Sequence, residues 1–300
     1  MNQIVEIIDL IKEFNGKRAV NQVSFSIQQG EVVAILGPNG AGKTTTMLMM
    51  LGLLRPTEGK TAIFQKDPKN KEVREKMGVM LQEVSLMDGL KVKELIQLFR
   101  SYYPNPLPMN HLIRLTGLEK NELERRTEKL SGGQKRRVAF ALALAGNPDL
   151  LFFDEPTVGM DISSRRLFWE TVKELASEGK TIIFTTHYLQ EADDYAERMI
   201  VFKNGSIIAD GKTAEIKRDM TKQSVSFVAG EVFSKGRFLK LSFVTEVIEK
   251  EGRVHIMTDD TDAVLSIIYK ENLPVKDIQI EKGKLEEAFE QLTASQEEAV

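Results

Sequence analysis

The chain of 300 residues contains no cysteine. Disulfide bonds and thiolate metal sites are therefore excluded, and the composition fits a reducing cytoplasm. Long apolar runs are lacking as well, because the longest, Val138 to Ala145, is far shorter than the ~20 residues that a membrane-spanning helix needs. We therefore expect any action of this protein at a membrane to depend on another chain.

Basic residues are not in excess, since 41 Lys and Arg stand against 44 Asp and Glu, for a net charge of −3. Nucleic-acid-binding proteins usually show a basic excess, so no nucleic-acid partner is expected. The N-terminal stretch carries Glu6 and Asp9 among its apolar residues, which does not fit a secretory signal peptide. The length allows one large domain or two of ordinary size.

The strongest motif is Gly-Pro-Asn-Gly-Ala-Gly-Lys-Thr, which runs from Gly37 to Thr44. It follows Glu31 to Leu36, which has the make-up of a buried parallel strand, and precedes Thr45 to Leu54, which has the pattern of a helix. A strand, a glycine-rich turn and a helix in this order predict a phosphate-binding P-loop. Glycines let backbone N–H groups surround a phosphate, and the helix N-terminus adds partial positive charge. Lys43 would then reach the terminal phosphates, and the Thr44 hydroxyl would bind Mg²⁺.

Two adjacent carboxylates, Asp154 and Glu155, follow the apolar run Leu150 to Phe153, which predicts a buried strand. Ligands bind at the C-terminal edge of open α/β sheets, and unpaired charge is costly to bury, so both acids are candidates for function. Asp154 suits Mg²⁺, and Glu155 suits the polarisation of a water molecule. A second buried strand, predicted at Thr181 to Thr186, leads to His187. A lone histidine is more often a packing or surface residue, but its place at the same predicted edge keeps a functional role open.

Two other residues have an ordinary interpretation and a functional one. Phe14 precedes the turn signal Asn15-Gly16 and is a packing residue or a platform for a purine. Gln82 ends the predicted strand that begins at Met77 and by itself is expected to be a solvated loop residue. Ser131 precedes Gly-Gly-Gln and a helix, where it is a plain N-cap or part of a second anion site.

Two further segments between the P-loop and residue 220 have a clear predicted structure. Residues 91 to 145 read as a helical insertion into a sheet protein, in which Lys135, Arg136 and Arg137 are expected to form a solvated face. Lys203-Asn204-Gly205 lies between two apolar runs and predicts a β-hairpin.

The polar stretch from Asp210 to Gln223 reads as a domain border, and residues 224 to 293 as a small α+β domain. Its predicted strands are Val225 to Val228, Val254 to Met257 and Val275 to Ile280, and its predicted helices are Thr261 to Glu271 and Lys284 to Leu292. It contains neither a glycine-rich loop nor a carboxylate pair at a strand end.

Taken together, these motifs resemble the ATP-binding subunits of ABC transporters over about residues 4 to 220. The elements that carry the resemblance are Walker A at Gly37 to Thr44, the Q-loop at Gln82, the signature Leu130-Ser-Gly-Gly-Gln134, the Walker B strand with its acid at Leu150 to Glu155, the D-loop Gly159-Met160-Asp161 and the switch histidine His187. Met160 stands where leucine is commonest in the D-loop, which is a volume-conserving difference.

The resemblance implies a role for each candidate residue. Glu155 would be the general base, with His187 and Lys43 holding the γ-phosphate, so these three form the expected catalytic group. Mg²⁺ would be held by Thr44, Gln82 and Asp154. The expected ATP-binding residues are Phe14 under the adenine, then Gly37, Pro38, Asn39, Gly40, Ala41, Gly42, Lys43, Thr44, Thr45 and Gln82, and, from a second subunit, Ser131 and Gly133.

The implied fold is an α/β P-loop ATPase of the ABC type, with a mixed sheet core, an antiparallel β subdomain and a helical subdomain at about residues 85–145. The expected domains are residues 1–220, which bind ATP, and residues 221–300, an accessory α+β domain. The latter resembles the extension on ATPases of bacterial ABC-2 type exporters (multidrug, antibiotic-peptide or sodium export), whose typical ending is matched by Lys284-Leu-Glu-Glu-Ala-Phe289.

The implied partners are transmembrane permease subunits and a second ATP-binding subunit, either a copy of this chain or a paralogue, at the cytoplasmic face of a bacterial membrane. Two non-transport alternatives remain. An ABC ATPase acting on ribosomes normally carries two ATPase domains in one chain, whereas this chain has one P-loop. An ABC ATPase of DNA maintenance needs a long coiled-coil insertion, and the gap from Thr45 to Lys129 is too short and too rich in proline.

Overall fold

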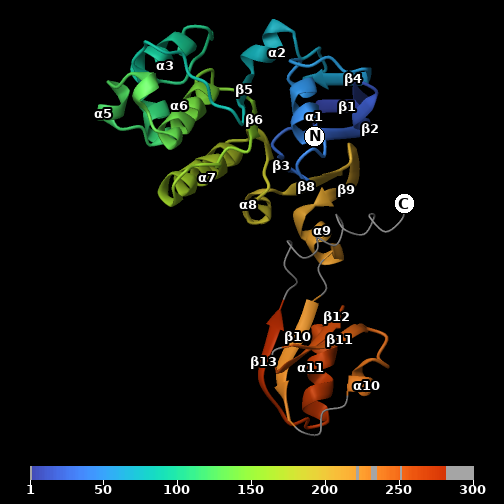
Figure 1. Ribbon diagram of the computed structural model, residues 1–300. Helices are drawn as coiled ribbons and strands as arrows, with labels where there is room; N and C mark the ends of the chain where they lie inside the picture. The colour runs from blue at the N-terminus through green and yellow to red at the C-terminus, as the bar shows by residue number, and fades with distance from the viewer. Residues whose placement is uncertain (1, 221–222, 231–234, 251, 282–300) are drawn as a thin grey trace. The chain divides into compact units, whose positions relative to one another are not determined.

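The computed structural model describes residues 2–220, 223–230, 235–250 and 252–281 and divides the chain into two compact units, Met1–Thr213 and Ala214–Val300 (Figure 1). The division falls a few residues before the domain border expected at residue 220. Each unit has its own sheets and its own core.

A six-stranded sheet with the strand order β5-β6-β7-β3-β8-β9 forms the centre of the first unit. Its strands are β3 (Val32–Leu36), β5 (Met77–Met80), β6 (Leu150–Asp154), β7 (Thr181–Thr185), β8 (Arg198–Lys203) and β9 (Ser206–Lys212). All neighbours are parallel except β9, which pairs antiparallel with β8. Strands β3, β6 and β7 are buried along their whole length, which explains their uninterrupted apolar sequences. Because these three strands are parallel, their C-terminal ends lie at one edge of the sheet.

A second, antiparallel sheet has the order β2-β1-β4 and consists of β1 (Gln3–Phe14), β2 (Lys17–Gln28) and β4 (Glu58–Ile63). The predicted hairpins at Asn15-Gly16 and Asn204-Gly205 are confirmed, the first joining β1 to β2 and the second joining β8 to β9. All four turn residues have positive φ, between 49° and 80°, as two-residue hairpin turns require.

The helices of the first unit include α1 (Lys43–Met50), α2 (Lys71–Glu75), α7 (Ile162–Ser177) and α8 (Leu189–Tyr195). Between β5 and β6 the chain forms α3 (Val92–Arg100), α4 (Met109–Thr116), α5 (Lys120–Leu123), a 3₁₀ turn (Thr127–Lys129) and α6 (Gly132–Leu144), as expected of the helical insertion. These helices gather in the green part of Figure 1. Helix α3 ends before Pro104, which cannot continue a helix.

The two faces of the central sheet contribute to different cores. Phe152 of β6 belongs to a cluster that also includes Ile35 of β3 and Met47 of α1. Its neighbour Phe153 points to the other face, because side chains alternate along a strand. There it packs edge-on against Phe140 of α6, with ring centroids 5.6 Å apart. Aromatic contacts continue through Phe168 and Trp169 of α7 to Phe184 of β7.

The expected solvated face on α6 is wrong for two of its three residues. Arg137 donates hydrogen bonds to the Gly117 carbonyl (2.6 Å) and to the carboxylate of Glu122, which is only 3% exposed. Arg136 is half-buried and donates to backbone carbonyls. The physical reason is packing: α6 lies against α3, α4 and β5, and the Arg136 and Arg137 side chains reach carbonyl groups of neighbouring segments.

The second unit contains α9 (Thr213–Met220) and an antiparallel sheet with the order β11-β12-β10-β13. Its other elements are β10 (Gln223–Ala229), α10 (Lys235–Phe238), β11 (Val244–Lys250), β12 (Arg253–Thr258), α11 (Thr261–Lys270) and β13 (Val275–Glu281). Its core includes Phe227, Ile256 and Val264. Strand β11 was not expected from the sequence, because most of its residues are exposed and it lacks a clean alternation. The predicted helix Lys284 to Leu292 lies outside the described residues.

Candidate functional site

The backbone of the glycine-rich loop between β3 and α1 lies so close to neighbouring carbonyl groups that two of its positions have no room for a side chain. Gly37 has φ 152°, and a Cβ at this position would lie 2.4 Å from the Phe202 carbonyl oxygen. At Gly42, with φ 100°, a Cβ would lie 2.6 Å from the carbonyl oxygen of Ala19. Gly42 is also the N-cap of α1 and has no side chain to cap the helix, so the first N–H groups of α1 keep no side-chain partner there. This arrangement fits a phosphate group.

Lys43 provides a buried cation in this loop. Its side chain is only 6% exposed, and its Nζ donates to the carbonyl oxygens of Gly37 (2.7 Å) and Pro38 (3.1 Å). Burial lowers the pKa of the Lys43 ammonium, while the negative charges of Glu155 and Asp154 act in the opposite direction. Lys43 thus stands between the loop and the two carboxylates that end β6.

Asp154 and Glu155 adopt different conformations although they are neighbours. Asp154 is the last residue of β6, and its Oδ1 accepts a hydrogen bond from the Thr185 hydroxyl and lies 3.5 Å from the Thr44 hydroxyl. Glu155 has φ 46°, in the left-handed region that non-glycine residues rarely adopt. Its N–H donates to both the hydroxyl (3.0 Å) and the carbonyl (3.1 Å) of Thr185, which hold this strained conformation in place.

Two residues far apart in the sequence converge on one oxygen of Glu155. The Gln82 Nε2 donates to Glu155 Oε2 over 3.1 Å. The His187 Nδ1 lies 3.3 Å from the same oxygen. The Glu155 side chain is 10% exposed, whereas that of His187 is 44% exposed and reaches solvent. A glutamine, a carboxylate and a histidine therefore meet at the end of β6, next to the P-loop.

The donor atoms at this edge fit a magnesium ion that arrives with phosphates. Thr44 and Asp154 offer hard oxygen ligands, and Mg²⁺ is usually held by one or two carboxylates together with substrate phosphates and water. Within the described residues, no group of three or more His, Cys, Asp or Glu side chains could hold a metal by itself.

Arg136 is a residue of the site that sequence reasoning missed. Its guanidinium donates to the carbonyl oxygens of Glu155 (3.1 Å) and Gln82 (3.0 Å), and burial lowers its pKa. Arg136 therefore links α6, which begins at the signature motif, to the backbone at Glu155 and to the backbone at Gln82 in the Q-loop. Its place just after the signature motif was the only signal in the sequence that could have found it.

Three further residues of the predicted motifs, Ser131, Phe14 and Asp161, lie at exposed positions. Ser131 caps α6 through a reciprocal pair of hydrogen bonds with Gln134, and its side chain reaches solvent, whereas Gly133 is half-buried. Phe14 is 46% exposed, with the Lys12 ammonium 5.0 Å from its ring centroid. Asp161 caps α7, and hydrogen bonds from Ser163 and Ser164 lower its pKa. Among the described residues, none of these three makes a hydrogen bond to the P-loop.

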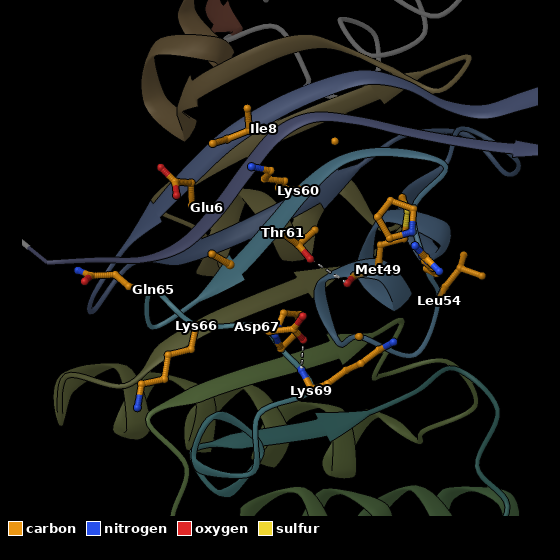
Figure 2. A pocket seen from close by; sticks show the side chains of 16 residues that line it. Glu6, Ile8, Met49, Leu54, Lys60, Thr61, Gln65, Lys66, Asp67 and Lys69 are labelled. Atoms are coloured by element: carbon orange, nitrogen blue, oxygen red, sulfur yellow. Dashed lines mark hydrogen bonds between the residues drawn. The ribbon is translucent and has the colours of Figure 1, made fainter.

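A separate pocket of about 610 Å³ lies beside the antiparallel sheet, away from this chemistry (Figure 2). Ile8, Lys60 and Thr61 face it from the sheet, and Asp67 and Lys69 from the following loop. No residue of the P-loop and neither carboxylate of β6 lines it. We therefore place the functional site at the ends of β3, β6 and β7 and not in this pocket.

Comparison with known proteins identifies the family. The ABC transporter domain model matches residues 20–158. The Nod factor export ATP-binding protein I of Burkholderia lata is 38% identical over 213 residues, which cover 69% of this chain and 70% of that protein. The daunorubicin/doxorubicin resistance ATP-binding protein DrrA of Streptomyces peucetius is 39% identical over 223 residues, covering 72% and 67%.

Among solved structures, the dimeric post-hydrolysis state of the ATP-binding cassette MJ0796 bound to ADP and Pi has a TM-score of 0.64 and 28% identity, covering 70% of this chain and 99% of that one. A structure of an ATP-binding subunit of an ABC transporter has a TM-score of 0.66 and 27% identity, covering 72% and 92%. These matches confirm the fold class and the resemblance expected from the motifs. The chain belongs to the ABC transporter family, as an ATP-binding subunit with ATPase activity.

Proposed function

We propose that this chain hydrolyses Mg-ATP at the edge formed by β3, β6 and β7 and thereby powers a separate permease that exports its substrate. The observation that carries the assignment is the convergence of Gln82 and His187 on Glu155, beside Asp154 and the P-loop. The turnover rate of a Glu155→Gln variant tests it.

The role proposed for each side chain follows from its position. Phosphoryl transfer to water depends mainly on positioning and on stabilisation of charge. Lys43 and the N–H groups of the loop hold the terminal phosphates, and Thr44 and Asp154, with Gln82 beside them, hold Mg²⁺. The ion, when bound, neutralises charge that develops on the phosphate oxygens. Glu155 orients and deprotonates the attacking water, and His187 steadies the γ-phosphate from the adjoining strand end.

The exposed predicted residues acquire a role if two ATP-binding subunits face each other. Ser131 and Gly133 would then contact the γ-phosphate bound to the P-loop of the partner, which explains why the signature helix begins at the surface. The related cassette MJ0796 is a dimer in its structure with ADP and Pi, which supports this arrangement. Phe14 would stack on the adenine. The second subunit is a copy of this chain or a paralogue.

Export is proposed from the names of the relatives, one an export protein for Nod factor and another a daunorubicin/doxorubicin resistance protein. No helix among the described residues is long and apolar enough to cross a bilayer. We therefore assign transport itself to the permease and place this chain at the cytoplasmic face of the membrane. The surface from Gln82 to Tyr103, which joins the Q-loop to α3, is the proposed docking region.

Membrane association should depend on the permease. In cell fractionation we expect this chain in the membrane fraction only when its permease is produced, because it has no proposed membrane contact of its own. The check is immunodetection of the chain in washed membranes from cells with and without the permease genes. Membrane binding that persists when every candidate permease has been deleted would count against the proposed partner.

Nucleotide binding should not require the second unit. The proposed ATP-binding residues all lie before residue 214, within the first unit. A chain shortened to residues 1–219 should therefore bind a fluorescent ATP analogue with nearly the affinity of the full chain. Circular dichroism establishes that the shortened chain is folded. A folded 1–219 chain without nucleotide binding would show that the proposed domain division is wrong.

A further inference from the structure

Glu191, on α8, is a buried carboxylate that no part of the proposed mechanism uses. It is 6% exposed, and three side chains surround its oxygens. The Thr157 hydroxyl donates to its Oε1 over 2.6 Å, and the Trp169 indole N–H donates to the same oxygen over 3.2 Å. The Thr186 hydroxyl donates to Oε2 over 2.7 Å. Burying a carboxylate is costly, so a site with this many donors calls for an explanation.

The direction of these hydrogen bonds follows from the partners. The indole nitrogen can only donate. The Thr186 hydroxyl already accepts a hydrogen bond from the Tyr188 N–H (3.0 Å), so its proton is available for Glu191. Glu191 is thus an acceptor on both oxygens, which is what an ionised carboxylate does well. Glutamine would place an NH₂ group where one of these hydroxyls donates, so that hydroxyl would have to turn and accept instead.

Two of the three partners of Glu191 belong to the segments that carry the candidate catalytic residues. Thr157 comes two residues after Glu155, on the segment that leaves β6, and Thr186 comes directly before His187, on the segment that leaves β7. Thr157 is 1% and Thr186 2% exposed, so water does not compete for these contacts. One carboxylate therefore joins the two segments at points next to the 3.3 Å contact between His187 and Glu155.

We propose that Glu191 is a positioning residue for ATP hydrolysis, which holds the Glu155 and His187 segments at a fixed separation through Thr157 and Thr186. Trp169 fixes the carboxylate in turn, because its ring is stacked on Tyr195 with centroids 4.4 Å apart and its edge meets Phe184. The proposal rests on the role proposed above for Glu155. Glu191 itself is not among the proposed nucleotide-binding residues.

The test uses the full chain with Glu191→Gln and Thr157→Val, each compared with a conservative or neighbouring control. A misplacement of about 1 Å at a reacting group can cost ~10²-fold in rate, so we expect kcat to fall about 10- to 100-fold in both variants. KM for ATP and binding of a fluorescent ATP analogue should stay near the wild-type values, since the P-loop is untouched. Thr157→Ser keeps the hydroxyl and should recover most of the rate. Gln190→Ala, at an exposed site on α8, should be neutral.

Several outcomes would overturn the proposal. Wild-type kcat in folded Glu191→Gln and Thr157→Val, with or without a lower melting temperature, would mean that the network serves stability alone. If Glu191→Gln does not fold, the Thr157→Val and Thr157→Ser pair decides, and equal rates in the two reject the proposal. Glu155→Gln, measured alongside, distinguishes a failure of the proposed general base from a failure of the proposed role of Glu191. Normal turnover in Glu155→Gln rejects the general base, whereas a slow Glu155→Gln beside a normal Thr157→Val rejects only the role of Glu191.

Discussion

Glu155→Gln is expected to bind Mg-ATP normally and to hydrolyse it about 10²–10⁴-fold more slowly than the wild-type chain, the range typical for loss of a general base. Glutamine keeps the shape of the side chain and removes its basicity. The residues that hold the phosphates, above all Lys43 and the loop glycines, are unchanged. Because binding continues while turnover stops, the variant should accumulate as an ATP-bound dimer. Steady-state phosphate release and light scattering with and without Mg-ATP measure the two effects.

The matched control is Glu178→Gln, which makes the same chemical change at an exposed position just after α7. It should retain the wild-type rate and show no unusual dimer. Near-wild-type turnover by Glu155→Gln in the presence of the permease would remove Glu155 from the mechanism. The water would then have to be activated by another group at this edge.

Lys43→Ala is expected to weaken ATP binding, the step that precedes hydrolysis. Lys43 is the buried cation of the P-loop, and nearby negative charge, which bound phosphates would increase, only partly compensates for its burial. A hydrogen bond to a charged group contributes about 1.5–3 kcal/mol, so we expect Kd for ATP to rise roughly 10- to 100-fold. Without tight binding, no ATP-dependent dimer should form. Titration with a fluorescent ATP analogue and light scattering give both quantities.

Lys71→Ala provides the control for removal of one positive charge, because the Lys71 side chain is 89% exposed and only pairs with Glu75 on α2. Surface pairs of this kind contribute little, so its binding should match the wild type. Unchanged ATP affinity in Lys43→Ala would show that the loop backbone alone holds the phosphates. The comparison with Glu155→Gln is informative, since one variant should lose the dimer and the other should accumulate it.

Much of this protein could be predicted from local sequence. The uninterrupted apolar runs of β3, β6 and β7 predict buried parallel strands, and each is followed by a polar group, which places Lys43, Glu155 and His187 at one sheet edge. The two Asn-Gly turns predict their hairpins, because few residues other than glycine and asparagine adopt positive φ at low cost. The P-loop could also be predicted from local sequence, because its backbone conformation requires glycines at fixed positions that lie close together in the chain.

Contacts between residues that lie far apart in the sequence could not be predicted from local sequence. Arg136 was expected in solvent, yet it reaches the carbonyls of Gln82 and Glu155, which are 54 and 19 residues away. Glu191 reads as one more acid on a short polar helix, and only the packing of α7 and α8 brings Trp169 and Thr157 to its oxygens.

The physical reason for this difference is that hydrophobic periodicity and turn chemistry act over a few residues and therefore determine which elements form. The partner of a polar side chain depends on how the finished elements pack, and local sequence carries little information about that packing. The sequence by itself thus determined the fold family, the phosphate loop and the candidate catalytic residues. The tertiary structure alone decided which buried groups hold those residues in place.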